Sequence, residues 1–150
     1  MKSERITVEQ TYDAPIARVW QALTDPVQMK QWYLDIPEFR PEVGCEFSFL
    51  AGDDKKKWLH HCKVTEVEPG KSVTYSWRYD GEAGNSFVTF ALSEQGDKTH
   101  LKITHSGLNT FPDKDEFRYE NFNEGWTCLA NQSLPEFLAK QPSISTISQP

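Results

Sequence analysis

The order of the hydrophobic patterns along the chain constrains its fold more than any single motif does. One alternating segment comes first, two short helical segments follow, then five alternating segments, and one long amphipathic segment comes last. Short connections between successive alternating segments favour antiparallel neighbours within one sheet. We therefore predict an α+β fold in which a curved antiparallel sheet is crossed by a long C-terminal helix, with a cavity beneath that helix.

The alternating segments place apolar side chains on one face of the predicted sheet. A period of two gives each strand one buried side and one wetter side. The residues expected on the buried side are Ile6, Val8 and Tyr12; Val43, Cys45, Phe47 and Phe49; Trp58, His60, Cys62 and Val64; Val73, Tyr75, Trp77 and Tyr79; Val88, Phe90 and Leu92; and Leu101, Ile103 and His105. Phe87 is expected on the wetter side, where it suggests a contact in a weak homodimer.

Three segments have helical patterns. The first begins near Pro15 and places Val19 and Leu23 on one face. The second begins near Asp25 and has Met29 and Trp32 as its expected buried contacts. The third, at 119–139, would be roughly 31 Å long and could cross a six-stranded sheet. Because proline cannot donate the helical hydrogen bond, Pro135 predicts a kink or break near Asn131.

Composition excludes several classes of protein. The 150 residues fit one domain at 1–140, followed by a flexible, polar tail at 141–150. A net charge of −6 argues against binding to nucleic acid, which needs a basic patch. No apolar segment is long enough to be inserted into a membrane, and no signal peptide is apparent. Three widely spaced cysteines fit a reducing cytoplasm, with the thiols as buried packing.

Two histidine positions raise the question of catalysis or metal binding. His105 shares the apolar face of its strand, and we expect either a hydrogen-bonded core histidine or a group that contacts a ligand or moves a proton. His60, His61 and Cys62 resemble a metal cluster in sequence, but alternation places His61 on the opposite face from the other two. We therefore expect no metal site and no cofactor.

The chain resembles the START-like (Bet v 1-like) proteins, and within them the family of the C-terminal domain of the heat-shock protein 90 ATPase activator. The resemblance covers roughly residues 4–140 and includes residues 14–15, 19–20, 22–26, 32, 41–44, 64–69, 77, 88–90, 99–108 and 125–126. It implies a helix-grip fold, in which a curved antiparallel sheet of about six or seven strands wraps around the C-terminal helix. Two short helices after the first strand support the other end of the groove. An apolar cavity between sheet and helix is also implied.

Binding of a small hydrophobic or aromatic molecule in that cavity is the first function we predict. A mostly apolar pocket with a few polar groups is typical of small-molecule sites. Gln10 is a further polar group that could orient a ligand. Two alternatives remain: a cyclase- or hydrolase-type enzyme using His105 with Tyr75 or His60, and a protein-interaction module of the co-chaperone kind. The expected cavity-lining residues are Trp32, Phe47, Phe49, His60, Tyr75, Trp77, Phe90, His105, Phe122 and Trp126.

Overall fold

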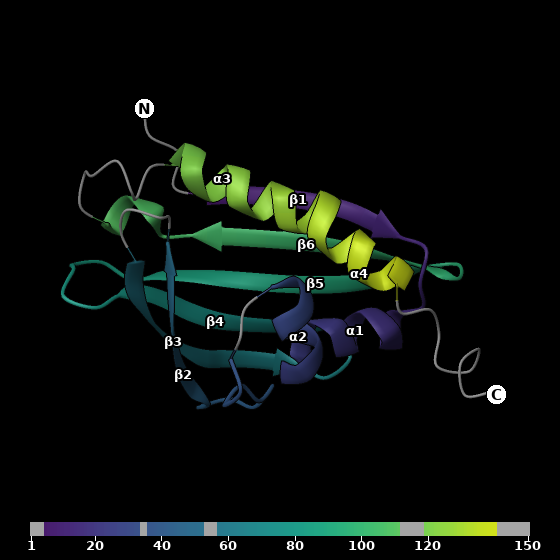
Figure 1. Ribbon diagram of the computed structural model, residues 1–150, viewed down its shortest axis with the longest axis horizontal. Helices are drawn as coiled ribbons and strands as arrows, with labels where there is room; N and C mark the ends of the chain where they lie inside the picture. Colours follow the sequence, from purple (N-terminus) through teal and green to yellow (C-terminus); the bar gives the residue numbers. More distant parts are fainter. Residues whose placement is uncertain (1–4, 34–35, 53–56, 112–118, 141–150) are drawn as a thin grey trace.

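Six strands form a single curved sheet in the computed structural model, which describes residues 5–33, 36–52, 57–111 and 119–140. All neighbouring strands are antiparallel, in the order β1-β6-β5-β4-β3-β2 (Figure 1). The predicted α+β architecture and strand number are therefore confirmed. The predicted tail at 141–150 lies outside the described residues. The strands are β1 (Arg5–Tyr12), β2 (Glu46–Gly52), β3 (Lys57–Glu68), β4 (Ser72–Tyr79), β5 (Ser86–Gln95) and β6 (Lys98–Ser106).

Two short helices follow β1 and carry the chain from one edge of the sheet towards the other. These are α1 (Ile16–Thr24) and α2 (Pro26–Trp32). Asp25 caps α2, since its side chain accepts a hydrogen bond from the Val27 backbone N–H at 3.2 Å. The Trp32 indole N–H donates to the Ala22 carbonyl at 2.8 Å, so α2 is fastened to α1. As predicted, Met29 and Trp32 are both buried.

The predicted C-terminal helix lies along the side of the sheet formed by β1 and β6 (Figure 1). It consists of α3 (Tyr119–Cys128), a π-helical turn η3 (Leu129–Ser133) and α4 (Leu134–Lys140). Its buried side chains Phe122, Trp126, Ala130 and Leu134 are spaced four residues apart. In a regular α-helix this spacing would drift by about 40° per step. The wider π turn reduces the drift and keeps the apolar stripe on the sheet.

The π turn also explains how the helix passes Pro135 without ending. The Leu134 N–H donates to the Leu129 carbonyl, five residues back, and helical backbone angles continue on both sides of the turn. The next donor in this pattern would be residue 135, and proline has no N–H, so the Ala130 carbonyl lacks a helical partner. The Tyr12 hydroxyl donates to that carbonyl at 2.6 Å. The irregularity expected near Asn131 is present as a π turn within a continuing helix.

Val43 is a point where the sequence prediction was wrong. It was expected on the buried side of the second strand, but β2 begins at Glu46 and Val43 is 67% exposed. Gly44 adopts a φ of +96°, and its N–H donates to the Val64 carbonyl at 2.8 Å. A left-handed residue interrupts strand alternation, so the pattern cannot be extended backwards through Gly44. Likewise, Cys128 is exposed rather than buried.

Candidate functional site

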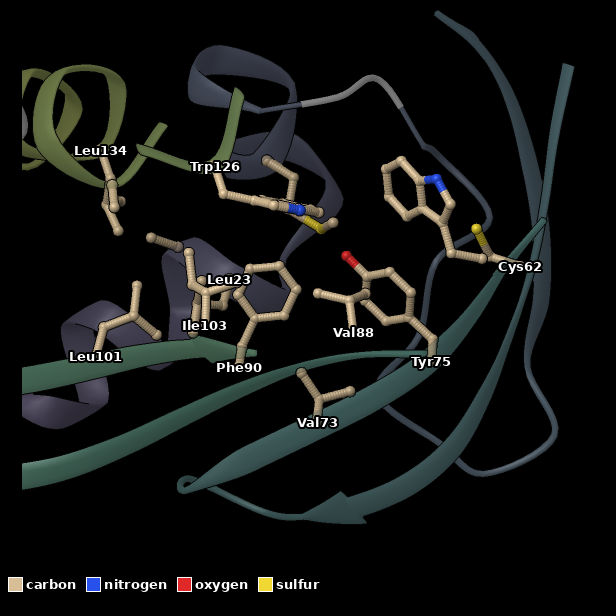
Figure 2. Packing of buried hydrophobic residues seen from close by; sticks show 14 of the residues in the cluster. Leu23, Cys62, Val73, Tyr75, Val88, Phe90, Leu101, Ile103, Trp126 and Leu134 are labelled. Carbon is tan, nitrogen blue, oxygen red and sulfur yellow. The ribbon is translucent and has the colours of Figure 1, made fainter. Parts of the chain in front are cut away.

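A layer of aromatic side chains fills the region between the sheet and the helices (Figure 2). All ten expected cavity-lining residues are buried, each less than 9% exposed. They come from α2, α3 and the inner faces of five strands, β2 to β6. The structure therefore brings together the residues that sequence reasoning selected, while their contact with a ligand stays a prediction. They are Trp32, Phe47, Phe49, His60, Tyr75, Trp77, Phe90, His105, Phe122 and Trp126.

The rings of this layer meet mainly edge to face. Tyr75 contacts Phe47 at 5.1 Å and Phe39 at 6.1 Å between ring centroids. Trp126 of α3 contacts Phe90 at 5.7 Å and Trp77 at 5.5 Å. Such arrangements match the positive edge of one ring to the negative face of the next. The helices thus rest on the sheet through one connected aromatic network.

His105 is fully buried, and both of its ring nitrogens are hydrogen-bonded. The Trp126 indole N–H donates to Nδ1 at 3.0 Å, so Nδ1 must lack a proton and Nε2 must carry one. Nε2 then donates to the Ser86 hydroxyl at 2.7 Å, and that hydroxyl donates to the Trp77 carbonyl at 2.8 Å. Burial lowers the pKa of His105 to about 3. This arrangement favours the core-histidine interpretation, in which His105 fastens α3 to the sheet.

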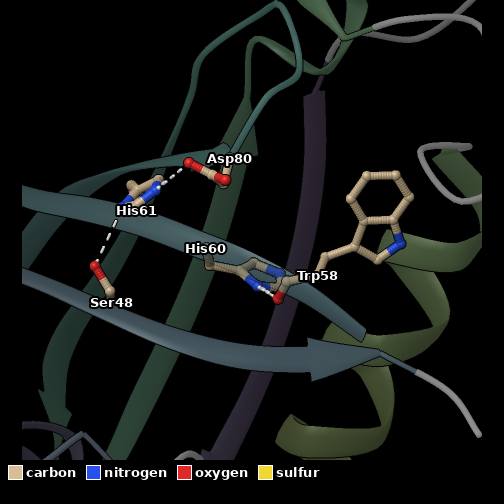
Figure 3. Close-up of polar contacts among 5 residues, drawn as sticks. All are labelled: Ser48, Trp58, His60, His61 and Asp80. Carbon is tan, nitrogen blue, oxygen red and sulfur yellow. Dashed lines mark hydrogen bonds and ion pairs between the residues drawn. The ribbon is translucent and has the colours of Figure 1, made fainter. Parts of the chain in front are cut away.

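His60 and His61 lie on opposite faces of β3, as alternation predicts (Figure 3). His60 stacks on Phe49 at 4.4 Å, and its Nδ1 donates to the Trp58 carbonyl at 2.8 Å. Burial lowers the pKa of His60 to about 4. His61 instead bonds Asp80 and Ser48 on the outer face. Within the described residues, no group of three or more His, Cys, Asp or Glu side chains is placed to hold a metal ion.

Gln10 does reach the helix side of the sheet. Its side-chain amide donates to the Asn131 side-chain oxygen at 2.8 Å, so it contacts the π turn. Together with the Tyr12 hydroxyl bond, this contact fastens the π turn to β1. Gln10 is therefore engaged with the terminal helix.

Tyr33 is a member of the aromatic layer that sequence reasoning missed. Its hydroxyl lies 2.8 Å from the Tyr75 hydroxyl, which joins the end of α2 to the middle of the sheet. The Tyr33 ring also stacks on Trp32 at 5.2 Å and contacts Trp126 at 6.1 Å. The helical spacing held the signal, because Met29, Trp32 and Tyr33 stand at i, i+3 and i+4 and share one helical face.

The Tyr33–Tyr75 pair is the one phenol pair in the described part of this layer joined hydroxyl to hydroxyl. Burial raises the pKa of both phenols well above their usual range, so both are protonated at any ordinary pH. The pair then carries two hydrogens, of which only one lies between the two oxygens. Figure 2 shows the Tyr75 hydroxyl pointing from the sheet into the layer.

Comparison with known proteins identifies the family. The model of the family described as "Activator of Hsp90 ATPase homolog 1-like protein" matches residues 13–139. The chain belongs to this family. The resemblance found in the sequence is therefore confirmed, and the START-like fold is shared with solved structures. A search among curated proteins returned no match.

Three solved structures illustrate the similarity of this family member to others. CalU16 from Micromonospora echinospora is 31% identical, with a TM-score of 0.70 over 97% of this chain and 81% of that one. MLL2253 from Mesorhizobium loti is 26% identical, with a TM-score of 0.74 over 93% and 99% of the two chains. CV1439 from Chromobacterium violaceum is 25% identical, with a TM-score of 0.70 over 93% and 99%. None of these names states a ligand.

Proteins with this fold commonly bind hydrophobic ligands. In the parts of the chain that the structure describes, no helix has both the length and the apolar character needed to cross a membrane. Ligand binding is thus a property common among proteins of this fold.

Proposed function

We propose that this protein binds a small apolar or aromatic molecule between the sheet and its covering helices. The observation that carries the proposal is the aromatic layer itself, in which rings from α2, α3 and five strands pack together. The Tyr33 and Tyr75 hydroxyls meet within this layer. Small-molecule sites are generally built in this way, from apolar walls and a few placed polar groups. The enzyme alternative has less support, because both nitrogens of His105 already have partners.

The position of α2 supports a way in for the ligand. The backbone of α2 packs mainly on α1 and α4. Its interaction with the sheet runs through side chains such as Tyr33, whose ring contacts Phe90 at 6.2 Å. Because this interaction is made by side chains, the end of α2 can shift while the strand hydrogen bonds stay intact. We infer that a ligand enters at the end of α2.

Dye binding to paired variants tests this proposal. N-phenyl-1-naphthylamine, a neutral dye that fluoresces in apolar surroundings, should bind with one dye per chain. Val88 is fully buried on the inner face of β5, whereas the neighbouring Thr89 lies on the outer face. Val88→Phe should therefore weaken dye binding at least tenfold, because the added ring occupies the layer.

Thr89→Phe is the matched control and should leave dye affinity unchanged. Circular dichroism and thermal unfolding establish that both variants fold. If Val88→Phe does not fold, hydrogen exchange of the wild-type amides in β4 and β5, with and without dye, provides the readout. A dye that neither saturates at one per chain nor protects these amides would refute the proposal.

A further inference from the structure

We infer that the Tyr33–Tyr75 pair is the polar recognition element of the site, and that the ligand is a neutral aromatic molecule carrying a hydrogen-bond acceptor such as a carbonyl or ether oxygen. This inference rests on the proposed function and specifies its ligand class. It starts from the 2.8 Å separation of the two hydroxyl oxygens. Whichever hydroxyl donates to the other, one hydrogen is left over.

The surroundings of the pair offer no acceptor for that second hydrogen among the described residues. The nearest rings are hydrocarbon surfaces: Phe47 and Phe90 lie 5.1 and 5.8 Å from the Tyr75 ring. Tyr75 is 2% exposed, whereas Tyr33 is partly buried. If Tyr33 donates to Tyr75, the leftover hydrogen lies in the interior, where donors nearly always have a partner. If Tyr75 donates to Tyr33, the leftover hydrogen lies at the partly buried end of the pair, where an incoming acceptor can reach it.

The other indole and imidazole nitrogens of the aromatic layer that act as donors already have partners. The Trp126 indole donates to His105, and the Trp32 indole donates to the Ala22 carbonyl. The Trp77 indole donates to the Tyr79 hydroxyl at 3.0 Å. An incoming ligand therefore finds its available hydrogen-bond donor at the tyrosine pair.

The absence of buried charge in the described residues selects a neutral ligand. The buried polar side chains are Thr24, His60, Ser86, Thr99 and His105, with no Lys, Arg, Asp or Glu among them. Burial also keeps the two histidines uncharged near neutral pH. A charged ligand would lose its hydration without gaining a counter-charge here. A ketone, ester, quinone or ether accepts the hydrogen bond without that cost.

The pair 9-fluorenone and fluorene tests this inference, since the two molecules have nearly the same shape and differ by a carbonyl in place of a methylene. Quenching of tryptophan fluorescence gives both affinities. The wild type should bind fluorenone at least tenfold more tightly than fluorene, because only fluorenone satisfies the leftover hydrogen. The double variant Tyr33→Phe/Tyr75→Phe should lose this preference, whereas Tyr12→Phe should keep it, because the Tyr12 hydroxyl is bonded to the Ala130 carbonyl.

A second measurement does not depend on the folding of the double variant. The carbonyl stretching band of fluorenone bound to the wild type should lie at lower frequency than in a hydrocarbon solvent, as expected for a carbonyl that accepts a hydrogen bond. Equal affinity for the two ligands with no band shift would overturn the inference and leave the proposed function standing. If neither ligand binds and the dye does not bind either, the proposed function fails as well.

Discussion

The four histidines of the chain have different surroundings on the two faces of the sheet. On the inner face, His60 and His105 are buried, neutral and bonded to backbone or to uncharged side chains. On the outer face, His61 and His100 each lie between a hydroxyl and a carboxylate. Because His60 and His61 are neighbours in sequence, strand parity alone decides which environment each receives.

Hydroxyl groups follow the same division. Four threonines stand in register across β1, β6, β5 and β4 on the outer face, namely Thr7, Thr104, Thr89 and Thr74. Thr74 and Thr89 are hydrogen-bonded to each other at 2.8 Å, and water can replace such a bond when one partner is lost. On the inner face the polar groups are buried, so a lost partner leaves a buried polar atom unsatisfied. Equivalent substitutions should therefore cost more on the inner face.

The largest expected effect is a loss of stability on acidification. The folded-state pKa values of about 4 for His60 and about 3 for His105 lie below the unfolded value of about 6.5. Well above pH 6.5 both histidines are neutral in both states. As the pH falls from there towards 4, the unfolded chain binds protons that the folded chain does not, so the free energy of unfolding decreases. Linkage gives roughly 2 kcal/mol per histidine between pH 7 and pH 5.

Urea denaturation at pH 7 and pH 5 measures this decrease. His60→Gln should remove about half of the histidine contribution, although it lowers the stability at both pH values. Val88→Ala, which removes buried apolar atoms and no ionisable group, is the control, and its stability loss should be the same at both pH values. An unchanged pH dependence in His60→Gln would contradict the neutral inner-face histidine.

Tyr12 and Thr11 provide the next contrast, since they are adjacent and lie on opposite faces of β1. Tyr12→Phe leaves the Ala130 carbonyl of the π turn without its donor and should cost about 1–3 kcal/mol of unfolding free energy. Thr11→Val removes only the partly exposed contact with His100 at 3.2 Å and should cost under about 1 kcal/mol. Thermal and urea unfolding at pH 8 measure both. Equal losses of unfolding free energy would mean that burial does not determine the cost of losing these two hydroxyl groups.

The smallest effect is expected for the outer-face histidine. His61→Asn breaks contacts with Ser48 at 3.2 Å and with the exposed carboxylate of Asp80 at 3.0 Å, and it should cost under about 1 kcal/mol. His60→Asn in the same strand loses a stacked, buried ring and should cost several times more. Urea denaturation at pH 8 again gives the comparison. A larger loss for His61→Asn than for His60→Asn would reverse the assignment of the faces.

Most of the fold followed from the sequence because alternation and helical spacing are local properties. The period-two pattern identified all six strands, and the exposure of Phe87, 40% in the structure, followed from the same parity. The pattern failed at Val43 because Gly44 turns the chain before β2 begins. A residue with positive φ resets the parity, and glycine in sequence does not say whether it adopts that conformation.

The candidate site was only partly predictable. Parity showed which rings face inwards, but hydrogen-bond partners depend on distances between distant segments. Nothing local indicates that Trp126 would donate to His105, or that Tyr33 would meet Tyr75, 42 residues further along. The helical pattern that identified Trp32 also predicts Tyr33 on the buried face when it is extended by one residue. The sequence therefore predicts which side chains face the layer, but it does not predict their hydrogen-bond partners.

The π turn at Leu129–Ser133 has a consequence for how this helix tolerates changes of length. A π turn holds one residue more than an α-helical turn, so the surplus is absorbed locally and the segments on either side keep their rotational phase. Removal of a single residue there would leave an ordinary α-helix with Trp126 and Leu134 still directed at the sheet. A single-residue deletion at this point is thus compatible with the whole architecture, whereas a deletion near Trp126 would turn half of the helix away from the core.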